Sequence, residues 1–351
     1  MNIQYVGKKT LCLPVIKLFD RKFEYIDYFF QNQKNDIEQL INTDLLKDTV
    51  FIVENKLPLC NSNAFTATAC FSSDKHIYLN EGYLQYLWEL SYGITITWHE
   101  LIHIPTIEKI IPDKKYFDNK PYSGYLLYIA DIHLKRALSF LHNGNLTNCY
   151  LSPWREYLGI SKILKDNYSS PRYATHFFEK VYVELANKVF GFALCYTLFH
   201  EVAHCKLNHL SIHKQLNQQL ESKQITQKEY GDKNRILEEE ADEYARSAFH
   251  LDKDDDSVIQ VLGSIIGSSV AIFFKNSTFR FDHPNSAYRL KKTIEKYANK
   301  KSNSELYSIG TIVMGYWDDN YKIKTFDLID NQKTHEETFN EYLKYAGCPT
   351  E

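Results

Sequence analysis

Apolar residues recur every three or four positions along most of the chain, which is the spacing of residues that share one face of a helix. This pattern predicts helices over residues 81–90, 125–141, 181–210, 236–250, 286–300 and 336–345. The 181–210 pattern fits either one long helix or two helices placed end to end. Two short β-branched and aromatic runs, at residues 50–53 and 76–79, predict strands instead. We therefore predict an α+β fold that is mostly helical and contains a small sheet.

One long apolar run, residues 258–274, is interrupted by small and polar residues such as Gly263, Ser264, Gly267 and Ser268. Its length of about 17 residues is at the lower limit for a bilayer span, and its small residues suit a tightly packed core helix. The first twenty residues show no charged start followed by a long apolar stretch, so we expect no signal peptide. These features predict a cytoplasmic protein without a membrane partner.

The composition and the charge exclude further classes of protein. The chain has 351 residues, of which 44% are hydrophobic, with 41 Lys plus Arg against 44 Asp plus Glu and a net charge of −3. A chain of this length and apolar content can bury a full core, which excludes intrinsic disorder. The near-neutral balance argues against DNA or RNA as a partner, because nucleic-acid-binding domains are usually clearly basic. The seven cysteines form no CxxC pair and predict no disulfide framework.

The strongest chemical motif is the run His-Glu-Val-Ala-His at residues 200–204. On a helix His200 and His204 lie one above the other, so both imidazoles can fill corners of one tetrahedral zinc site. Glu201 is placed to reach a water molecule beside the zinc, whose pKa the metal lowers to about 7, and to take its proton as general base. His209 would lie about 140° around a continuous helix from His204, so we do not expect it to join the same metal.

A hydrolytic zinc site needs a third protein ligand, and the best candidate is in the run Glu-Glu-Glu-Ala-Asp at residues 238–242. Glu238 and Asp242 are four residues apart, so one helix can offer Glu238 to the metal and Asp242 to the far nitrogen of a ligating imidazole. Three successive glutamates also suit a solvated helix start. The upstream motif favours the metal interpretation, with Glu239 and Glu240 as the next ligands to test.

A second His-Glu-x-x-His run lies at residues 99–103. Pro105 follows it closely and would end or kink a helix there. The preceding residues 92–97 are β-prone and contain a glycine, and no Glu-x-x-Ala-Asp run follows. We therefore interpret this copy as structural or coincidental and predict one Zn²⁺ per chain.

Four segments together resemble the gluzincin metallopeptidases, especially the M48-type peptidases. Residues 200–209 and 238–242 look like their paired signatures, residues 63–67 with 76–82 are similar to their upstream segment, and residues 282–289 resemble their His-Pro…Arg motif. The resemblance implies a zincin-like metallopeptidase core with a small sheet and an active-site helix. It implies His200, His204 and Glu238 as ligands, Glu201 as base, and Asp242 behind a ligand.

The downstream motif supplies candidates for stabilising the oxyanion of the reaction. The resemblance implies that His283 approaches the metal or this oxyanion, and Tyr288 or Arg289 is the reserve donor. The alternative for His283 is an ordinary turn residue ahead of Pro284 at a helix start. The sequence leaves both interpretations of His283 open.

M48 enzymes commonly carry membrane helices, and this sequence shows none. In that respect the chain is more similar to the Lit-type phage-exclusion peptidases (family U49). That resemblance implies a bacterial protease that cleaves elongation factor Tu when a phage peptide is present. The expected partners are therefore a protein substrate and an activating peptide or protein.

The same segments suggest how the chain is divided. Residues 1–50, with an aromatic run at 23–30, form an expected N-terminal helical region. Residues 51–300 form the expected gluzincin-like catalytic core, with an inserted segment at about 93–180. Residues 301–351 form an expected C-terminal helical extension.

We expect the substrate to lie extended along an edge strand at residues 76–79, held by backbone hydrogen bonds. Two alternatives stay open. The zinc could be structural in a non-catalytic regulatory protein, although Cys205 beside His204 points about 100° away and fits poorly as a fourth ligand. The protein could also be an enzyme that is dormant until triggered, with residues 93–180 or 211–234 as lid or sensor.

Overall fold

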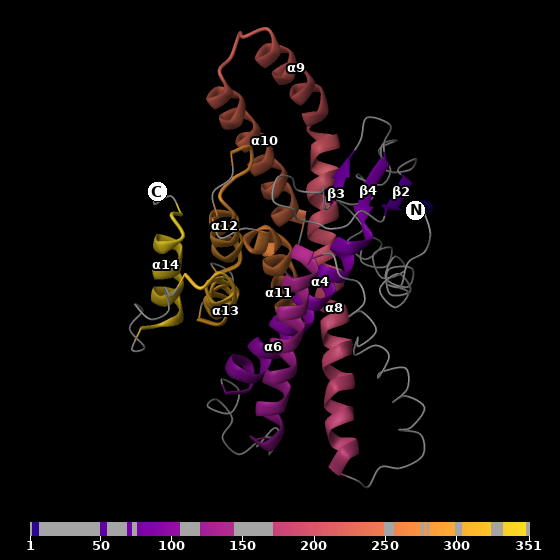
Figure 1. Cartoon of the computed structure of the whole chain (residues 1–351), viewed down its shortest axis with the longest axis vertical. Coiled ribbons are helices and arrows are strands. Elements are labelled where there is room, and N and C mark those ends of the chain that lie inside the picture. The colour runs from indigo at the N-terminus through magenta and orange to yellow at the C-terminus, as the bar shows by residue number, and fades with distance from the viewer. Residues whose placement is uncertain are drawn as a thin grey trace.

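The computed structural model describes eleven stretches of the chain, namely residues 2–6, 50–54, 69–71, 76–105, 120–143, 171–248, 256–274, 277–278, 281–298, 304–323 and 333–348. The aromatic run at 23–30 and the predicted upstream segment at 63–67 lie outside these residues. All candidate residues of the expected metal site lie within them. The described chain is mostly helical, as predicted, and its helices surround a shared apolar core (Figure 1).

The helices account for most of the described residues. They are α4 (Glu81–Trp98), α6 (Lys120–Asn143), α8 (Pro171–Lys206), α9 (His209–Glu221), α10 (Gln227–Ala248), α11 (Asp256–Ser269), α12 (Ser286–Ala298), α13 (Ser304–Tyr321) and α14 (His335–Tyr345). A π-helical turn, η1 (His99–His103), follows α4, and a 3₁₀ turn, η3 (Val270–Phe274), follows α11. The sequence pattern located α4, α6, α8, α10, α11, α12 and α14.

Helix α8 is the longest described helix and runs along the long axis of the molecule (Figure 1). The predicted 181–210 pattern ends at a break: α8 runs to Lys206, Asn208 adopts a left-handed conformation with φ of 57°, and α9 starts at His209. Helix α10 then starts with a capping box, in which Thr226 and Glu229 bond each other's backbone N–H groups. Helices α9 and α10 form a hairpin that projects from one end of the molecule (Figure 1).

Helix α4 corrects one expectation. The β-prone residues 92–97 are helical and continue α4 to Trp98. Tyr92, Ile94 and Ile96 are fully buried, so burial in the helical core outweighs their β propensity. The hydroxyl of Thr97 donates to the Gly93 carbonyl oxygen one turn back, at 2.9 Å, which satisfies this polar group inside the helix.

The described strands form a four-stranded sheet with the order β1-β2-β4-β3, from β1 (Asn2–Val6), β2 (Val50–Glu54), β3 (Ala69–Phe71) and β4 (His76–Asn80). Strand β4 pairs in parallel with β2 and antiparallel with β3. The expectation that residues 76–79 form an edge strand is therefore wrong, because the unpredicted β3 covers that side. Strand β3 is the edge and contacts α8. Strand β1 lies in the expected N-terminal helical region, of which the structure describes nothing else before residue 50.

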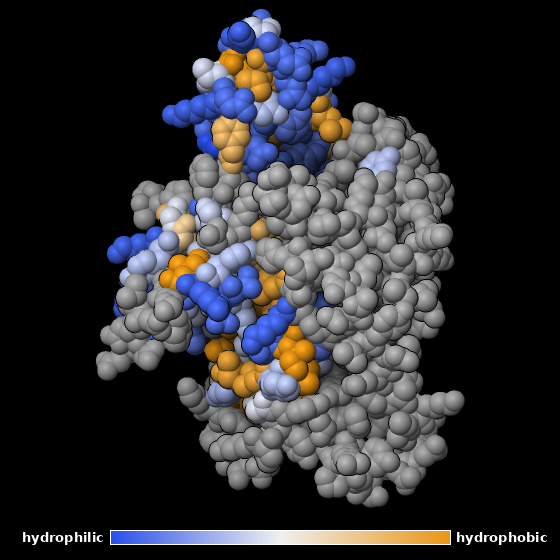
Figure 2. Space-filling model, in the orientation of Figure 1, coloured by the Kyte–Doolittle hydropathy of each residue, from blue (hydrophilic) through white to orange (hydrophobic). Residues whose placement is uncertain are grey.

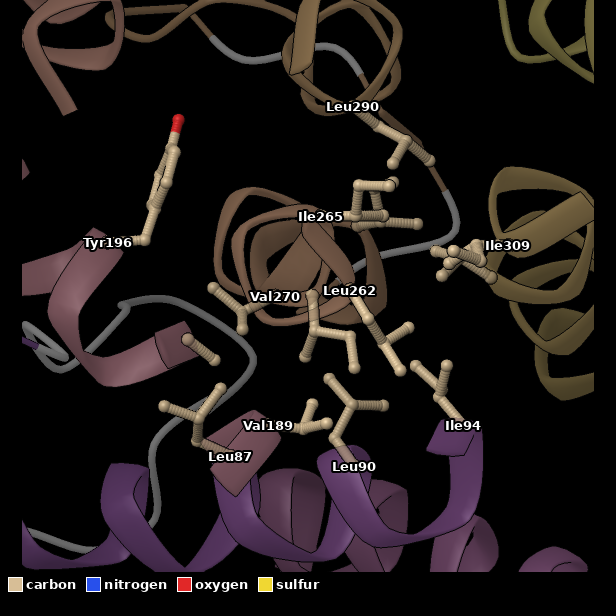
Figure 3. Close-up of a cluster of buried hydrophobic side chains, with 14 of the residues drawn as sticks. Leu87, Leu90, Ile94, Val189, Tyr196, Leu262, Ile265, Val270, Leu290 and Ile309 are labelled. Atoms are coloured by element: carbon tan, nitrogen blue, oxygen red, sulfur yellow. The ribbon is translucent and has the colours of Figure 1, made fainter. Parts of the chain in front are cut away.

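The core forms where α4, α8, α11, α12 and α13 meet. Figure 3 shows Leu87, Leu90 and Ile94 of α4 facing Val189 of α8 and Leu262 of α11. Helix α11 approaches α8 so closely that a Cβ atom on Gly263 would lie 2.4 Å from the Phe192 Cβ and 2.8 Å from the Val189 carbonyl oxygen. This contact confirms that the 258–274 run is a tightly packed core helix. None of the described helices is long and apolar enough to cross a membrane.

The surface of the projecting hairpin is mainly hydrophilic, with a few apolar residues among the charged ones (Figure 2). Ile236 on α10 is an apolar residue of this hairpin that is 56% exposed. An open groove of about 310 Å³ between the two helices is lined by Ile212, Gln215, Leu216, Gln219, Lys233, Ile236 and Leu237. The hairpin therefore has a mainly hydrophilic surface and a small, mainly apolar groove. One residue of that groove, Leu237, directly precedes Glu238 in the sequence.

The close contact between α8 and α11 predicts a marked effect of Gly263→Ala. The added methyl group would overlap backbone and side-chain atoms of α8, so we expect a loss of about 1–3 kcal/mol of unfolding free energy. Gly124→Ala on α6 is the matched control, because no heavy atom lies within 4 Å of its Cβ position and alanine is the better helix former by about 0.5–1 kcal/mol. Urea unfolding followed by circular dichroism measures both. Equal stability of Gly263→Ala and the unchanged protein would contradict the tight contact.

Candidate metal centre

Three helices bring the candidate residues together. Helix α8 carries His200 and His204 near its C-terminal end, α10 carries Glu238 and Asp242, and α12 carries Arg289 near its start. Helix α10 contacts both α8 and α12. One face of α10 is buried and includes Leu237, Glu238, Ala241, Asp242 and Ala245, which follow helical spacing. The packing of α10 on α8 therefore places its two carboxylates opposite the histidine pair.

The ligand atoms of His200, His204 and Glu238 all lie within 4.8 Å of one another, and all three residues are buried. The two Nε2 atoms are 3.1 Å apart, and Glu238 places its oxygens 3.2 Å from His200 Nε2 and 3.6 Å from His204 Nε2. Ligands bound tetrahedrally to zinc at about 2.0–2.1 Å are separated by about 3.3 Å. The spacing of these donors thus fits a metal ion. Among the described residues, no other group of three or more His, Cys, Asp or Glu side chains has its possible ligand atoms this close together.

Asp242 lies behind His200 and is 1% exposed. His200 Nδ1–H donates to Asp242 Oδ1 at 2.9 Å, and the hydroxyl of Tyr196 donates to the same oxygen at 3.3 Å. Arg289 donates to both oxygens of Asp242, from Nε and Nη2, each at 2.6 Å. The carboxylate holds the proton of His200 on Nδ1, which leaves Nε2 directed at Glu238 and His204.

The electrostatics of the two histidines differ sharply. Burial would lower the pKa of His200, but the hydrogen bonds and charges of Asp242 and Glu238 raise it to about 10. Burial and the charge of His200 lower the pKa of His204 to about 3. Burial opposes ionisation of both carboxyls. The hydrogen bond and charge of His200 nevertheless hold the pKa of Glu238 well below its ordinary value, and Arg289 together with His200 does the same for Asp242. Without a metal, the centre is a protonated His200 between two carboxylates.

The three successive glutamates lie in the middle of α10 and not at its start. Glu238 is buried in the centre, whereas Glu239 and Glu240 are exposed. The hydroxyl of Tyr288 donates to Glu239 at 3.2 Å, and Glu240 accepts a hydrogen bond from His209 at 3.1 Å. Among the three, the structure therefore turns Glu238 toward the histidine pair.

His283 lies beside the centre, with Nε2 3.6 Å from an oxygen of Glu238 and Nδ1 donating to Asp282 at 2.9 Å. Its side chain is 34% exposed. Asn285 caps α12 by accepting hydrogen bonds from the N–H groups of Ala287 and Tyr288, so His283 is also the turn residue ahead of a helix. The two interpretations of His283 are thus compatible with each other.

Glu201 is buried and directly follows His200 on α8. Burial raises the pKa of Tyr83 well above its ordinary value, the hydrogen bond to Thr197 opposes the rise, and the negative charge of Glu201 adds to it. Tyr83 and Thr197 are 2.7 Å apart between their hydroxyl oxygens. Sequence reasoning missed Tyr83, which no local pattern connects to α8. It also missed Tyr196, although its position four residues before His200 places it on the same helix face.

The second His-Glu-x-x-His run forms η1, where a π-helical turn ends α4. His99 Nδ1–H donates to the hydroxyl of Tyr182 at 2.7 Å, and that hydroxyl donates to the buried Glu100. The ring of His103 lies 4.8 Å from that of Trp98, with Nδ1 3.8 Å from Glu305. These partners belong to the packed end of a helix.

The structure defines a mostly helical protein with a buried His-His-Glu centre that could hold a metal ion. A family model described as Peptidase U49 matches residues 77–310, which is well over half of the chain and includes every residue named for this centre. The chain belongs to this family of Lit-type peptidases, which confirms the predicted resemblance to family U49. Comparisons with curated proteins and with solved structures give no match.

The buried position of Asp242 predicts that Asp242→Asn strongly destabilises the protein. Arg289 would keep its charge in a largely buried place without a carboxylate, so we expect a loss of about 3–5 kcal/mol of unfolding free energy. Asp131→Asn on α6 is the control, because its ion pair with Lys135 is largely exposed and contributes at most about 1 kcal/mol. Denaturant unfolding of the metal-free proteins tests this difference, and similar losses for the two variants would contradict it.

The raised pKa of His200 predicts that metal binding displaces a proton. At pH 8 the metal-free His200 is protonated, whereas a ligand must be neutral, so we expect about one proton released per ion. Below a pKa of about 10, the affinity should rise about tenfold per pH unit. Calorimetric titration with Cd²⁺ in buffers of different ionisation enthalpy measures the released protons. Cd²⁺ is chosen because it acidifies bound water less than Zn²⁺ does, so the released protons report on His200. A release near zero at pH 8 would show that His200 is neutral.

Proposed function

We propose that this protein is a zinc-dependent endopeptidase that cleaves a protein substrate by hydrolysis. The observation that carries the proposal is the buried triangle of His200, His204 and Glu238, with Asp242 behind one histidine and Glu201 beside it. Two imidazoles and one carboxylate are the ligand set of catalytic zinc sites that keep one position open. Membership of a peptidase family supports peptide bonds as the substrate class.

Each residue has a role in this proposal. His200, His204 and Glu238 would hold one zinc ion, which would supply Lewis acidity to the scissile carbonyl and lower the pKa of a nearby water molecule. Glu201 accepts the proton of the attacking water and later delivers it to the leaving amine. Asp242 keeps His200 in the tautomer that presents Nε2 to the ion.

His283 is the favoured donor to the oxyanion. Its Nε2 atom lies near Glu238, and its side chain is partly open to solvent, so it can reach a substrate. The two reserve donors have other partners, because Arg289 binds Asp242 through two nitrogens and Tyr288 donates to Glu239. A hydrogen bond donated by His283 would stabilise the negative charge that develops during attack.

The edge of the sheet offers a place for the substrate backbone. Strand β3 has β4 on one side, forms the edge of the described sheet and contacts α8, which carries the histidine pair. An extended peptide can pair with such an edge through backbone hydrogen bonds, largely independently of its sequence. The substrate strand is therefore placed along β3 in this proposal, and not along residues 76–79.

The resemblance to Lit-type peptidases extends the proposal to a biological role. It suggests a phage-defence protease that acts in the cytoplasm on elongation factor Tu and is activated by a phage peptide or protein. A non-catalytic zinc protein that regulates a partner is the alternative. The two differ in one measurable property, which is whether Glu201 is needed for the appearance of a cleaved protein.

Replacing Glu201 with Gln tests the proposal in cells. The substitution removes the base but keeps the three ligands, so we expect retained zinc and at least about a 100-fold loss of cleavage. New protein N-termini are compared between cells that express the wild-type protein or Glu201→Gln, with and without phage infection. Glu221→Gln, at an exposed position on α9, is the matched control and should behave like the wild type.

One new terminus that depends on Glu201 would support a dedicated endopeptidase and would identify its target. Cleavage of elongation factor Tu would support the phage-defence role, whereas another target would support the chemistry alone. Equal cleavage by the wild-type protein and Glu201→Gln would contradict Glu201 as the base. A zinc-loaded protein that yields no new terminus in either condition would favour the non-catalytic alternative.

A further inference from the structure

His209 is fully buried at the start of α9, although it is a polar residue next to a turn. Its ring lies edge-on to that of His204, with 5.1 Å between the ring centroids. His209 Nδ1 is 3.0 Å from His204 Nδ1, and His209 Nε2 is 3.1 Å from an oxygen of Glu240 on α10. His209 thus connects His204 of the centre with an exposed carboxylate of the hairpin.

The break between α8 and α9 brings His209 into contact with His204. On a continuous helix His209 would lie about 140° away from His204. Asn208 adopts a left-handed conformation with φ of 57°, which ends α8 and starts α9 in a new direction. The new direction places the ring of His209 against the nitrogen of His204 that faces away from Glu238.

The protons of the three residues can be assigned from their partners. His204 must present an unprotonated Nε2 to a metal ion, so its proton is on Nδ1. His204 Nδ1–H therefore donates to His209 Nδ1, which acts as acceptor. His209 must then carry its proton on Nε2, and it donates this proton to the carboxylate of Glu240. In this arrangement each of the two N–H groups, on His204 and on His209, has one acceptor.

We propose that His209 and Glu240 are positioning residues that hold His204 in its metal-binding tautomer and orientation. They would do for His204 what Asp242 does for His200, but through a neutral imidazole and a carboxylate at the surface. The side chain of Glu240 is 54% exposed, whereas that of Asp242 is 1% exposed. His209 should therefore matter more than Glu240. The proposal rests on the metal site of the proposed function.

Metal affinity tests this proposal without any assay of activity. Zn²⁺ affinity is measured by competition with a chromophoric chelator for the full-length protein and for His209→Ala, His209→Asn and Glu240→Ala. Outer partners of a ligating histidine typically contribute about 10–100-fold to affinity, so we expect a loss in that range for His209→Ala. His209→Asn should recover most of it, because its Oδ1 atom occupies the place of Nδ1 and can accept from His204. Glu240→Ala should cause a smaller loss.

The matched control is His213→Ala, because His213 lies one turn further along α9 with its ring 6.3 Å from that of His204. We expect its affinity to equal that of the wild type. As a second readout, the visible spectrum of the Co²⁺-loaded protein should change with His209→Ala and return with His209→Asn. A purely structural role of His209 would not be reversed in this way by asparagine.

The outcomes separate the two proposals. Wild-type protein that binds no Zn²⁺ would overturn both the metal site and the positioning role. Wild-type protein that binds Zn²⁺, with unchanged affinity in His209→Ala, would overturn the positioning role alone. If His209→Ala does not fold, His209→Asn and the exposed Glu240→Ala still decide the question. Wild-type affinity in Glu240→Ala together with no recovery of Zn²⁺ binding in His209→Asn would contradict the proposal.

Discussion

The buried carboxylate of Asp242 is the interaction on which the described centre depends. It lies on α10 and accepts hydrogen bonds from His200 and Tyr196 of α8 and from Arg289 of α12. Moving a carboxylate out of water costs several kcal/mol, and only several well-placed donors and a nearby cation can offset that cost. The three helices must therefore keep their relative positions for the charge to remain buried. Because Glu238 is one turn before Asp242, the same contact also fixes the third candidate ligand.

The helical core below this contact keeps α8 in place. Helix α8 is held from one side by α11, whose glycines allow backbone contact, and from another by α4. Tyr196 joins the two regions, because its ring belongs to the apolar cluster while its hydroxyl points away from that cluster (Figure 3) and bonds Asp242. Ligands on rigid, packed helices are held more accurately than ligands on loops. The geometry of the centre is thus a consequence of the packing of α8.

The two histidines of the centre are held in different ways. Asp242 holds His200 with a buried charge, and against the effect of burial Asp242 and Glu238 together raise the pKa of His200 to about 10. His204 has a second histidine behind it, and burial and the charge of His200 lower the pKa of His204 to about 3. One imidazole is charged and the other neutral in the metal-free protein. The α8–α9 break that brings His209 to His204 also starts the hairpin of α9 and α10, so this end of the centre is linked to an element that projects from the molecule (Figure 1).

The sequence by itself determined the features that depend on local spacing. Helical periodicity located most helices, and the i, i+4 spacing within residues 200–204 and 238–242 placed each pair of candidate residues on one helix face. The family resemblance rested on the same local motifs. These predictions succeeded because a residue and its neighbours one turn away are related by helix geometry alone.

Only the tertiary structure decided which distant groups meet. It made residues 92–97 helical by burying them, and it placed β4 between β2 and the unpredicted β3. It directed Arg289 to Asp242, and it returned His209 to His204 after a turn that periodicity does not reveal. The physical reason is that burial, strand pairing and ion pairing join residues far apart in the chain. A local pattern carries no information about which of those partners lies nearby.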